Sequence, residues 1–147
     1  MRKLILVIAV AAVLVVAGWY WLNMATRPVV QVTSFSVNPS TITSAQNATL
    51  TVGLTNNDNV KGHGIVLVFS SHALVSFYIG DQPLQRSGSD WRLAINMLAS
   101  ESRTQVLTVR AGLESGVSQI TYRISMTASV DGTQTESKSL DLTVRAP

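Results

Sequence analysis

The chain has 147 residues, a formal net charge of +3 at pH 7 and no cysteine. The lack of cysteine excludes disulfides, thiolate metal sites, a cysteine nucleophile and a bacterial lipoprotein anchor. The basic residues do not form a nucleic-acid-binding stripe. Arg2, Lys3 and Arg27 lie around one apolar segment, and the other Lys and Arg residues are interspersed with an equal number of acids.

The first predicted element is an apolar segment, residues 4–22, which contains no charge and no proline. As a helix it is about 28 Å long, close to the thickness of the hydrocarbon layer of a bilayer. We expect residues 1–22 to be a transmembrane anchor in the cell membrane, with the N-terminus cytoplasmic and the C-terminal domain extracytoplasmic. Two basic residues precede the segment and three aromatic residues close it as an interfacial belt: Arg2, Lys3, Trp19, Tyr20 and Trp21.

A cleaved secretory signal, with cleavage after Gly18, is the alternative reading of this segment. The apolar run continues through Leu22, and the Ala-x-Ala pattern at residues 9–11 lies too early for a cleavage site, so we favour an anchor. Residues 23–28 form a short linker that reaches at most about 20 Å. A domain at residues 29–147 must therefore work close to the outer membrane face.

The rest of the chain has the alternating pattern of short strands and no helical period. In the first strand the phase of the apolar residues changes near Thr33 and Ser34, which predicts a bulge there. Seven or eight strands separated by turns predict an all-β, immunoglobulin-like antiparallel β-sandwich. The expected strands lie at 29–37, 49–55, 65–69, 74–79, 91–97, 107–111, 120–128 and 140–144.

The last two strands allow a prediction of their register. Asp131-Gly132 has the composition of a two-residue hairpin turn. In both strands the apolar residues have even numbers, so such a turn would place core residues opposite polar ones. We therefore predict a three-residue loop, 130–132, that pairs Tyr122 with Leu140.

Several segments resemble one family of exported modules. The motifs are Phe35–Ser40, Ala48–Asn56, Tyr122–Met126 and the Asp131-Gly132 turn. They are similar to the immunoglobulin-like CARDB modules of archaeal and bacterial surface proteins, and the resemblance covers most of residues 30–145. It implies a β-sandwich with an adhesive, spacer or assembly role, and it brings no catalytic residues. The layout of one anchor and one module is also similar to that of archaeal motor-filament stator subunits.

The polar residues predict no catalytic site, no cofactor and no metal centre. His63 and His72 flank one strand, and at roughly 3.3 Å per residue an extended strand keeps them more than about 20 Å apart. The acids, including Asp58 and Glu101, do not have the spacing of a calcium-binding loop, and no two of them must lie on the same face of a strand. Asn47-Ala48-Thr49 matches the N-glycosylation acceptor, although the threonine also suits a strand, and both interpretations stay open.

One strand departs from the pattern of a half-buried sandwich. If Ile65, Leu67 and Phe69 fill the core, Val66 and Val68 face outward. Either the 81–90 loop covers these valines through Leu84, or they contact a partner. The candidate partner face consists of Val66 and Val68, joined by Leu74 and Tyr78 if the two strands pair.

These features predict a non-catalytic, single-pass membrane protein. Its extracytoplasmic domain would be an accessory or assembly subunit of a membrane or cell-surface complex, with the bilayer and proteins of the surface layer or a filament as partners. The alternative is a module that binds a ligand or glycan between loops 56–64 and 81–90. A shared pocket between these loops would favour that alternative.

Overall fold

A computed structural model describes residues 12–20 and 28–147 of the chain. Residues 12–20 are helical. In these described ranges no helix combines the length and the apolar character that crossing a membrane requires. Most of the predicted anchor, including Arg2, Lys3 and Trp21, lies outside the described residues, so the anchor stays a prediction.

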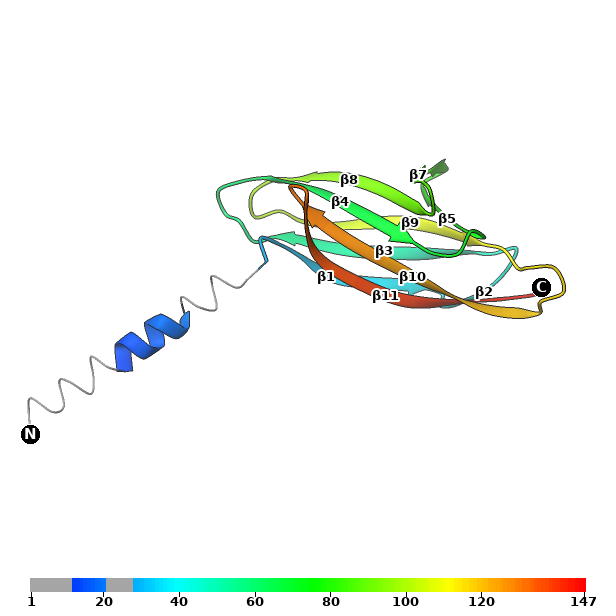
Figure 1. The fold of residues 1–147 in the computed structure, drawn as a ribbon, viewed down its shortest axis with the longest axis horizontal. Coiled ribbons are helices and arrows are strands. Elements are labelled where there is room, and N and C mark those ends of the chain that lie inside the picture. Colours follow the sequence, from blue (N-terminus) through cyan, green and yellow to red (C-terminus); the bar gives the residue numbers. More distant parts are fainter. Residues whose placement is uncertain (1–11, 21–27) are drawn as a thin grey trace, which may run out of the picture.

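The domain consists of two β-sheets packed face to face (Figure 1). One sheet has the order β1 (Val30–Asn38), β3 (Asn47–Asn56), β9 (Ser102–Ala111), β5 (Val75–Ile79) and β6 (Gln82–Pro83). The other has the order β2 (Thr41–Thr43), β11 (Thr133–Arg145), β10 (Gln119–Val130), β4 (His63–Ser70), β8 (Asp90–Met97) and β7 (Gln85–Ser87). This confirms the predicted all-β sandwich. The β2–β11 pair is parallel, which departs from the expected antiparallel pairing.

The core lies between the sheets because alternate residues of each long strand point inward. On β3 the inward residues are Leu50, Val52 and Leu54, and all three are buried. Aromatic rings connect the layers: the ring of Phe69 on β4 stacks on that of Phe77 on β5, with ring centroids 5.3 Å apart. The Phe77 ring also meets the edge of Trp91, on β8, at 5.1 Å. Within the described ranges Asn56 is the one buried polar residue.

The predicted bulge in the first strand is present. Val32 pairs with Leu54 and Ser34 pairs with Gly53, so Thr33 is the extra residue. The bulge changes which residues face the core. Before it the even-numbered Val30 and Val32 point inward, and after it the odd-numbered Phe35 and Val37 do.

The predicted register of the last hairpin is wrong. Asp131 and Gly132 form a two-residue turn, with φ angles of 48° and 86°, and Val130 pairs with Thr133 across it. A register shift opposite Ala128 and Ser129 leaves Thr135 as an extra residue. The bulge supplies the one extra residue that the three-residue loop was expected to supply, so the apolar residues of both strands still face the core. Tyr122 therefore pairs with Leu142 instead of Leu140.

The two ends of the sandwich differ in what they carry. At one end the chain enters β1, beside the loops 57–62 and 98–101 and the turn 131–132 (Figure 1). We call this the entry end. The opposite end, which we call the far end, carries the loops 71–74 and 112–118. The paired strands β4 and β8 run from one end to the other, with the His63–Met97 pair at the entry end and the Ser70–Asp90 pair at the far end.

Candidate functional site

The outer face of β4 carries the two valines predicted to contact a partner. Val66 and Val68 are half-buried and point away from the core, because Ile65, Leu67 and Phe69 fill the inner face. Leu84 is buried with the core residues, so it belongs to the sandwich interior. β4 is an interior strand, with β10 on one side and β8 on the other.

Small and polar side chains surround the two valines. Val66 lies opposite Ala94 and Ser129, and Val68 lies opposite Arg92 and Thr127. Farther along the same face, hydroxyl pairs link β10 to β11, with oxygens 3.0–3.3 Å apart: Thr121–Thr143, Ser125–Ser139 and Thr127–Ser137. The valines are thus a small apolar centre in a hydroxyl-rich sheet face.

The four-residue partner face expected from the sequence does not form. It required β4 to pair with β5, but β4 belongs to the six-stranded sheet and β5 to the five-stranded sheet. Leu74 lies just before β5, and Tyr78, on β5, carries the guanidinium of Arg110 over its ring, 4.4 Å from the centroid. Leu74 and Tyr78 are therefore separated by the sandwich from Val66 and Val68.

Sequence reasoning missed a cluster of charged side chains at the entry end. His63 Nδ1 lies 2.7 Å from an Asp131 carboxylate oxygen, and His63 Nε2 lies 3.0 Å from an Asp58 carboxylate oxygen. The second oxygen of Asp131 accepts the Gly64 N–H, and the second oxygen of Asp58 accepts the N–H groups of Val60 and Lys61. The imidazole thus holds the β3–β4 loop against the β10–β11 turn.

The hydrogen bonds of this cluster shift its pKa values. Those to Asp131 and Asp58 raise the pKa of His63 above 6.5, because the imidazolium can donate to both carboxylates. Backbone donors, Val60 first, and the His63 hydrogen bond lower the pKa of Asp58 from 3.8 to about 2. The His63 hydrogen bond, followed by the Gly64 N–H, also lowers the pKa of Asp131. Between pH 3.8 and pH 6.5 the cluster is thus an imidazolium between two carboxylates.

A buried amide joins the loops of the entry end. Asn56 is 1% exposed, and its Nδ2 donates to the carbonyl oxygens of Lys61 and Leu98, at 3.0 and 2.8 Å. Its Oδ1 accepts the N–H of Asp58, and the Ser100 N–H donates to the carbonyl of Asp58. The loops 57–62 and 98–101 therefore form one hydrogen-bonded unit.

The second histidine occupies the far end. His72 stacks on Tyr122, with ring centroids 5.2 Å apart, and its Nε2 lies 3.5 Å from a Glu114 oxygen. It is thus separated from His63 by the length of β4. Across residues 12–20 and 28–147, no three His, Asp or Glu side chains are arranged to hold a metal ion. The expectation of a non-metal protein stays a prediction.

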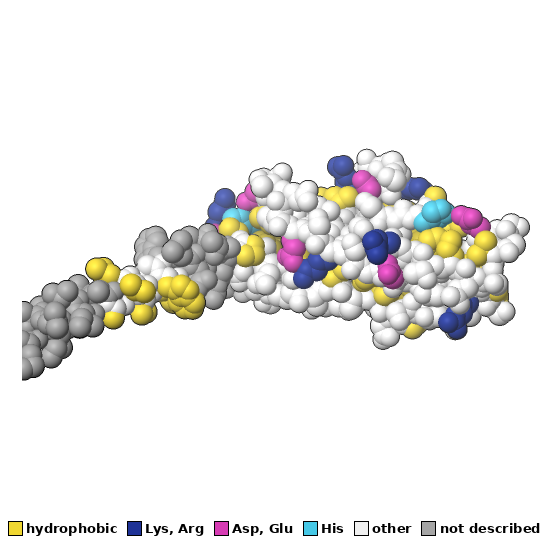
Figure 2. All heavy atoms as spheres, turned by 60° about the horizontal axis from the view of Figure 1, so that its bottom comes forward, with side chains coloured by type: hydrophobic (Ala, Val, Ile, Leu, Met, Phe, Trp, Pro, Cys, Tyr) yellow, Lys and Arg dark blue, Asp and Glu magenta, His cyan; other side chains and the backbone are white. Residues whose placement is uncertain are grey.

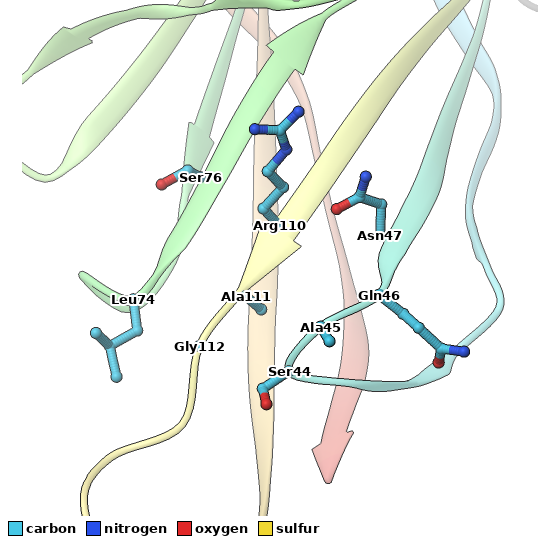
Figure 3. A pocket seen from close by; sticks show the side chains of 9 residues that line it. All are labelled: Ser44, Ala45, Gln46, Asn47, Leu74, Ser76, Arg110, Ala111 and Gly112. Atoms are coloured by element: carbon cyan, nitrogen blue, oxygen red, sulfur yellow. The ribbon is translucent and has the colours of Figure 1, made fainter. Parts of the chain in front are cut away.

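The predicted ligand loops do not share a pocket. Loop 56–64 is at the entry end, whereas residues 81–90 lead into the far end of β8, where Asp90 pairs with Ser70. A groove of about 400 Å³ opens elsewhere, on the five-stranded sheet at the far end (Figure 3). Arg110 and Asn47, from neighbouring strands, both line it. Asn47 is exposed there, as a glycosylation acceptor must be.

Two aromatic residues of the predicted membrane belt are described. Trp19 and Tyr20 lie on the helix of residues 12–20, and both side chains are exposed, as are those of Val13 to Val16. The other predicted interface residues, Arg2, Lys3 and Trp21, lie outside the described residues.

Comparison with known proteins identifies no family. The sequence matches no protein-family profile, and no curated protein matches it. Solved structures with a similar fold include the native form of Escherichia coli alpha-2-macroglobulin, at 19% identity and a TM-score of 0.54 over 82% of this chain. The sporulation control protein Spo0M of Bacillus subtilis matches at 11% identity and a TM-score of 0.54, also over 82% of this chain.

The chain spans only part of these neighbours, 7% of the alpha-2-macroglobulin chain and 51% of the Spo0M chain. A third neighbour is the Pseudomonas fluorescens alkylpurine DNA glycosylase AlkC, at 13% identity and a TM-score of 0.50 over 80% of this chain and 31% of that one. Identities this low carry the fold and nothing of the function.

Proposed function

We propose that this chain is a non-catalytic, single-pass membrane protein with an extracytoplasmic accessory or assembly domain. The domain is an immunoglobulin-like sandwich similar to a CARDB module, and it contacts a protein partner at the outer membrane face. Components of a surface layer or of a filament are the partners that this architecture suits. The N-terminus is cytoplasmic, and the anchor keeps the domain at the membrane.

The observation that carries the assembly role is the outward position of Val66 and Val68 on an interior strand. Edge strands attract partners through their backbone, but an interior strand offers only side chains. Two β-branched side chains, with the small residues Ala94 and Ser129 beside Val66, leave an apolar surface that a second protein can approach closely. The surrounding hydroxyls supply hydrogen bonds at the rim, as an interface with an apolar centre requires.

The membrane assignment rests on the sequence of residues 4–22 and on the charges around it. The exposed apolar side chains of residues 13–16, with Trp19 and Tyr20, suit a lipid environment. The non-catalytic assignment rests on what surrounds the two histidines. Both ring nitrogens of His63 are bonded to carboxylates, and the ring of His72 stacks on Tyr122 and lies beside Glu114, so both imidazoles are engaged in structural contacts.

The test compares two matched substitutions in the full-length chain, purified from its host in mild detergent. Val68→Asp places a charge on the outer face of the six-stranded sheet. Val106→Asp places the same charge on the outer face of the five-stranded sheet, where Val106 is 52% exposed on the interior strand β9. We expect a protein that co-purifies with the wild type to be lost from Val68→Asp and kept by Val106→Asp.

Loss of the partner from Val106→Asp alone would move the interface to the other sheet and contradict the proposal. Thermal unfolding of each variant separates loss of binding from loss of fold. The orientation has its own test, because protease added to intact cells should degrade residues 28–147. Protection of the domain in intact cells, with digestion after lysis, would overturn the proposed topology.

A further inference from the structure

Apolar side chains stand in solvent at the entry end of the sandwich. Val60 is 85% exposed, Leu98 is 75% exposed and Val29 is 43% exposed. Loop tips are ordinarily built from polar and turn-forming residues, so large apolar side chains grouped there indicate a surface that is covered in use. Figure 2 shows hydrophobic side chains beside charged ones at this end of the domain.

These side chains are held by hydrogen bonds between the loops that carry them. The Asn56 amide binds the carbonyls of Lys61 and Leu98, which places the tips of the two loops next to each other. The Asn57 side-chain amide donates to the carbonyl of Pro28 at 3.0 Å, and its backbone N–H donates to the carbonyl of Val29 at 2.7 Å. The entry end therefore presents its apolar side chains in a fixed arrangement at the point where the chain arrives from its N-terminal segment.

Acidic and basic side chains are mixed around the apolar tips. Asp58, Asp131 and Glu101 are the acids of this end. Lys61, Arg103 and His63 are its basic residues, His63 lies between Asp58 and Asp131, and Arg103 Nε lies 3.0 Å from a Glu101 oxygen. No field of one sign opposes the approach of an anionic lipid surface. A lysine beside an apolar tip also suits the headgroup layer, because its stem can lie along the lipid while the ammonium stays in water.

From these observations we infer that Val60 and Leu98 insert into the outer leaflet of the membrane that holds the N-terminal anchor, so that the sandwich stands on its entry end. The inference rests on the proposed membrane anchoring. Residues 23–28 reach at most about 20 Å, so the end that receives the linker cannot move far from the lipid surface. An amphipathic helix at a membrane interface buries its apolar face about 5–10 Å deep, and apolar side chains on loop tips need to go no deeper. The bilayer is therefore the nearest apolar phase available to these two side chains.

The experiment uses the full-length chain in vesicles of phosphatidylcholine and phosphatidylglycerol. Because the protein has no cysteine, a single introduced cysteine carries an environment-sensitive fluorophore at one chosen position. The test positions are Val60→Cys, Leu98→Cys and Lys61→Cys. Leu74→Cys, an exposed leucine of the far end, is the matched control, and Val15→Cys on the N-terminal helix reports anchoring.

We expect a blue shift and quenching by nitroxide-labelled lipid at positions 60, 61 and 98, and neither effect at position 74. In a Val60→Asp, Leu98→Asp background, the label at position 61 should lose its quenching. Quenching at position 15 with none at 60, 61 and 98 would overturn the inference and leave the anchor intact. No quenching at position 15 would contradict the membrane anchoring itself, and with it the inference.

Discussion

The Nδ1 atom of His63 lies 2.7 Å from a carboxylate oxygen of Asp131, at the junction of β4 and the β10–β11 turn. On the other side of the ring, Nε2 lies 3.0 Å from Asp58. A neutral imidazole has one N–H and can donate to only one of these carboxylates, whereas an imidazolium donates to both. Protonation of His63 therefore tightens the entry end of the sandwich.

This cluster predicts a pH range of greatest stability. The pKa of His63 is raised above 6.5 in the folded state, so its contribution is complete below pH 6.5 and is lost as the pH rises through the raised pKa. The pKa of Asp58 is lowered from 3.8 to about 2, so its contribution is present above pH 3.8 and is lost as the pH falls toward 2. We expect the contribution of the cluster to be complete between these limits.

We expect the Tm of the wild type to fall as the pH rises above 6.5 through the raised pKa of His63, and we expect His63→Gln to remove this fall. The glutamine amide does not titrate, so the variant should be less stable at pH 5 and closer to the wild type at pH 9. Thermal unfolding followed by circular dichroism across this pH series measures both. His72→Gln is the control and should keep the wild-type slope, and an unchanged slope in His63→Gln would contradict the prediction.

Asn56→Ala should destabilise the domain more than Asn57→Ala does. The first substitution leaves the carbonyls of Lys61 and Leu98 without their donor, at a cost of about 1–3 kcal/mol in the free energy of unfolding. Asn57 is exposed and water can replace its amide, so its loss should cost about 1 kcal/mol or less. Urea unfolding measures the difference, and equal losses would contradict the role given to the buried amide.

Gly62→Ala should be harmful although the φ angle of Gly62 is not in the left-handed region. A Cβ at this position would lie 2.7 Å from the carbonyl oxygen of Met97, a backbone atom that cannot move without shifting the strand end. We expect a loss of about 1–3 kcal/mol. Gly112→Ala is the matched control, because its Cβ would meet only Leu74, at 3.9 Å. A stable Gly62→Ala variant would show that the two loops can separate at little cost.

The inward residues of the long strands could be predicted from the sequence because alternation has a direct physical cause. Leu50, Val52 and Leu54 are buried as expected, and the bulge at Thr33 follows from the change of phase around it. The last hairpin shows the limit of this reasoning. Alternation required one extra residue between Tyr122 and its partner, but it could not distinguish a longer loop from a bulge at Thr135.

Pairing between distant strands could not be predicted in the same way. Residues 71–74 are short enough for a hairpin, yet they connect one sheet to the other, so that Phe69 and Phe77 meet across the core. The partner face that joined Val68 to Tyr78 failed for this reason. The cluster around His63 was missed because it also depends on pairing between distant strands. Asp131 reaches Gly64 only when β4 pairs with β10. A prediction that β4 pairs with β10 would have placed His63 beside Asp131.

Two side chains of β11, Glu136 and Lys138, bond to the backbone of β1, and this contact gives the last prediction. A Glu136 carboxylate oxygen accepts the N–H of Val32 at 2.9 Å, and the Lys138 ammonium donates to the carbonyl of the same residue at 3.0 Å. The two side chains also pair with each other at 3.1 Å. They thus bond both the N–H and the carbonyl of Val32, the residue that precedes the bulge.

Glu136→Ala and Lys138→Ala should each cost about 1–2 kcal/mol in the free energy of unfolding, because each breaks a charge-assisted bond to the backbone. The double variant should lose less than the sum of the two, since the first substitution already removes their mutual contact. Arg123→Ala and Asp141→Ala form the matched control pair. Their side chains, 3.4 Å apart, are largely exposed on a sheet face, so their coupling should be small. Additive losses for Glu136 and Lys138 in urea unfolding would show that the two bonds act independently.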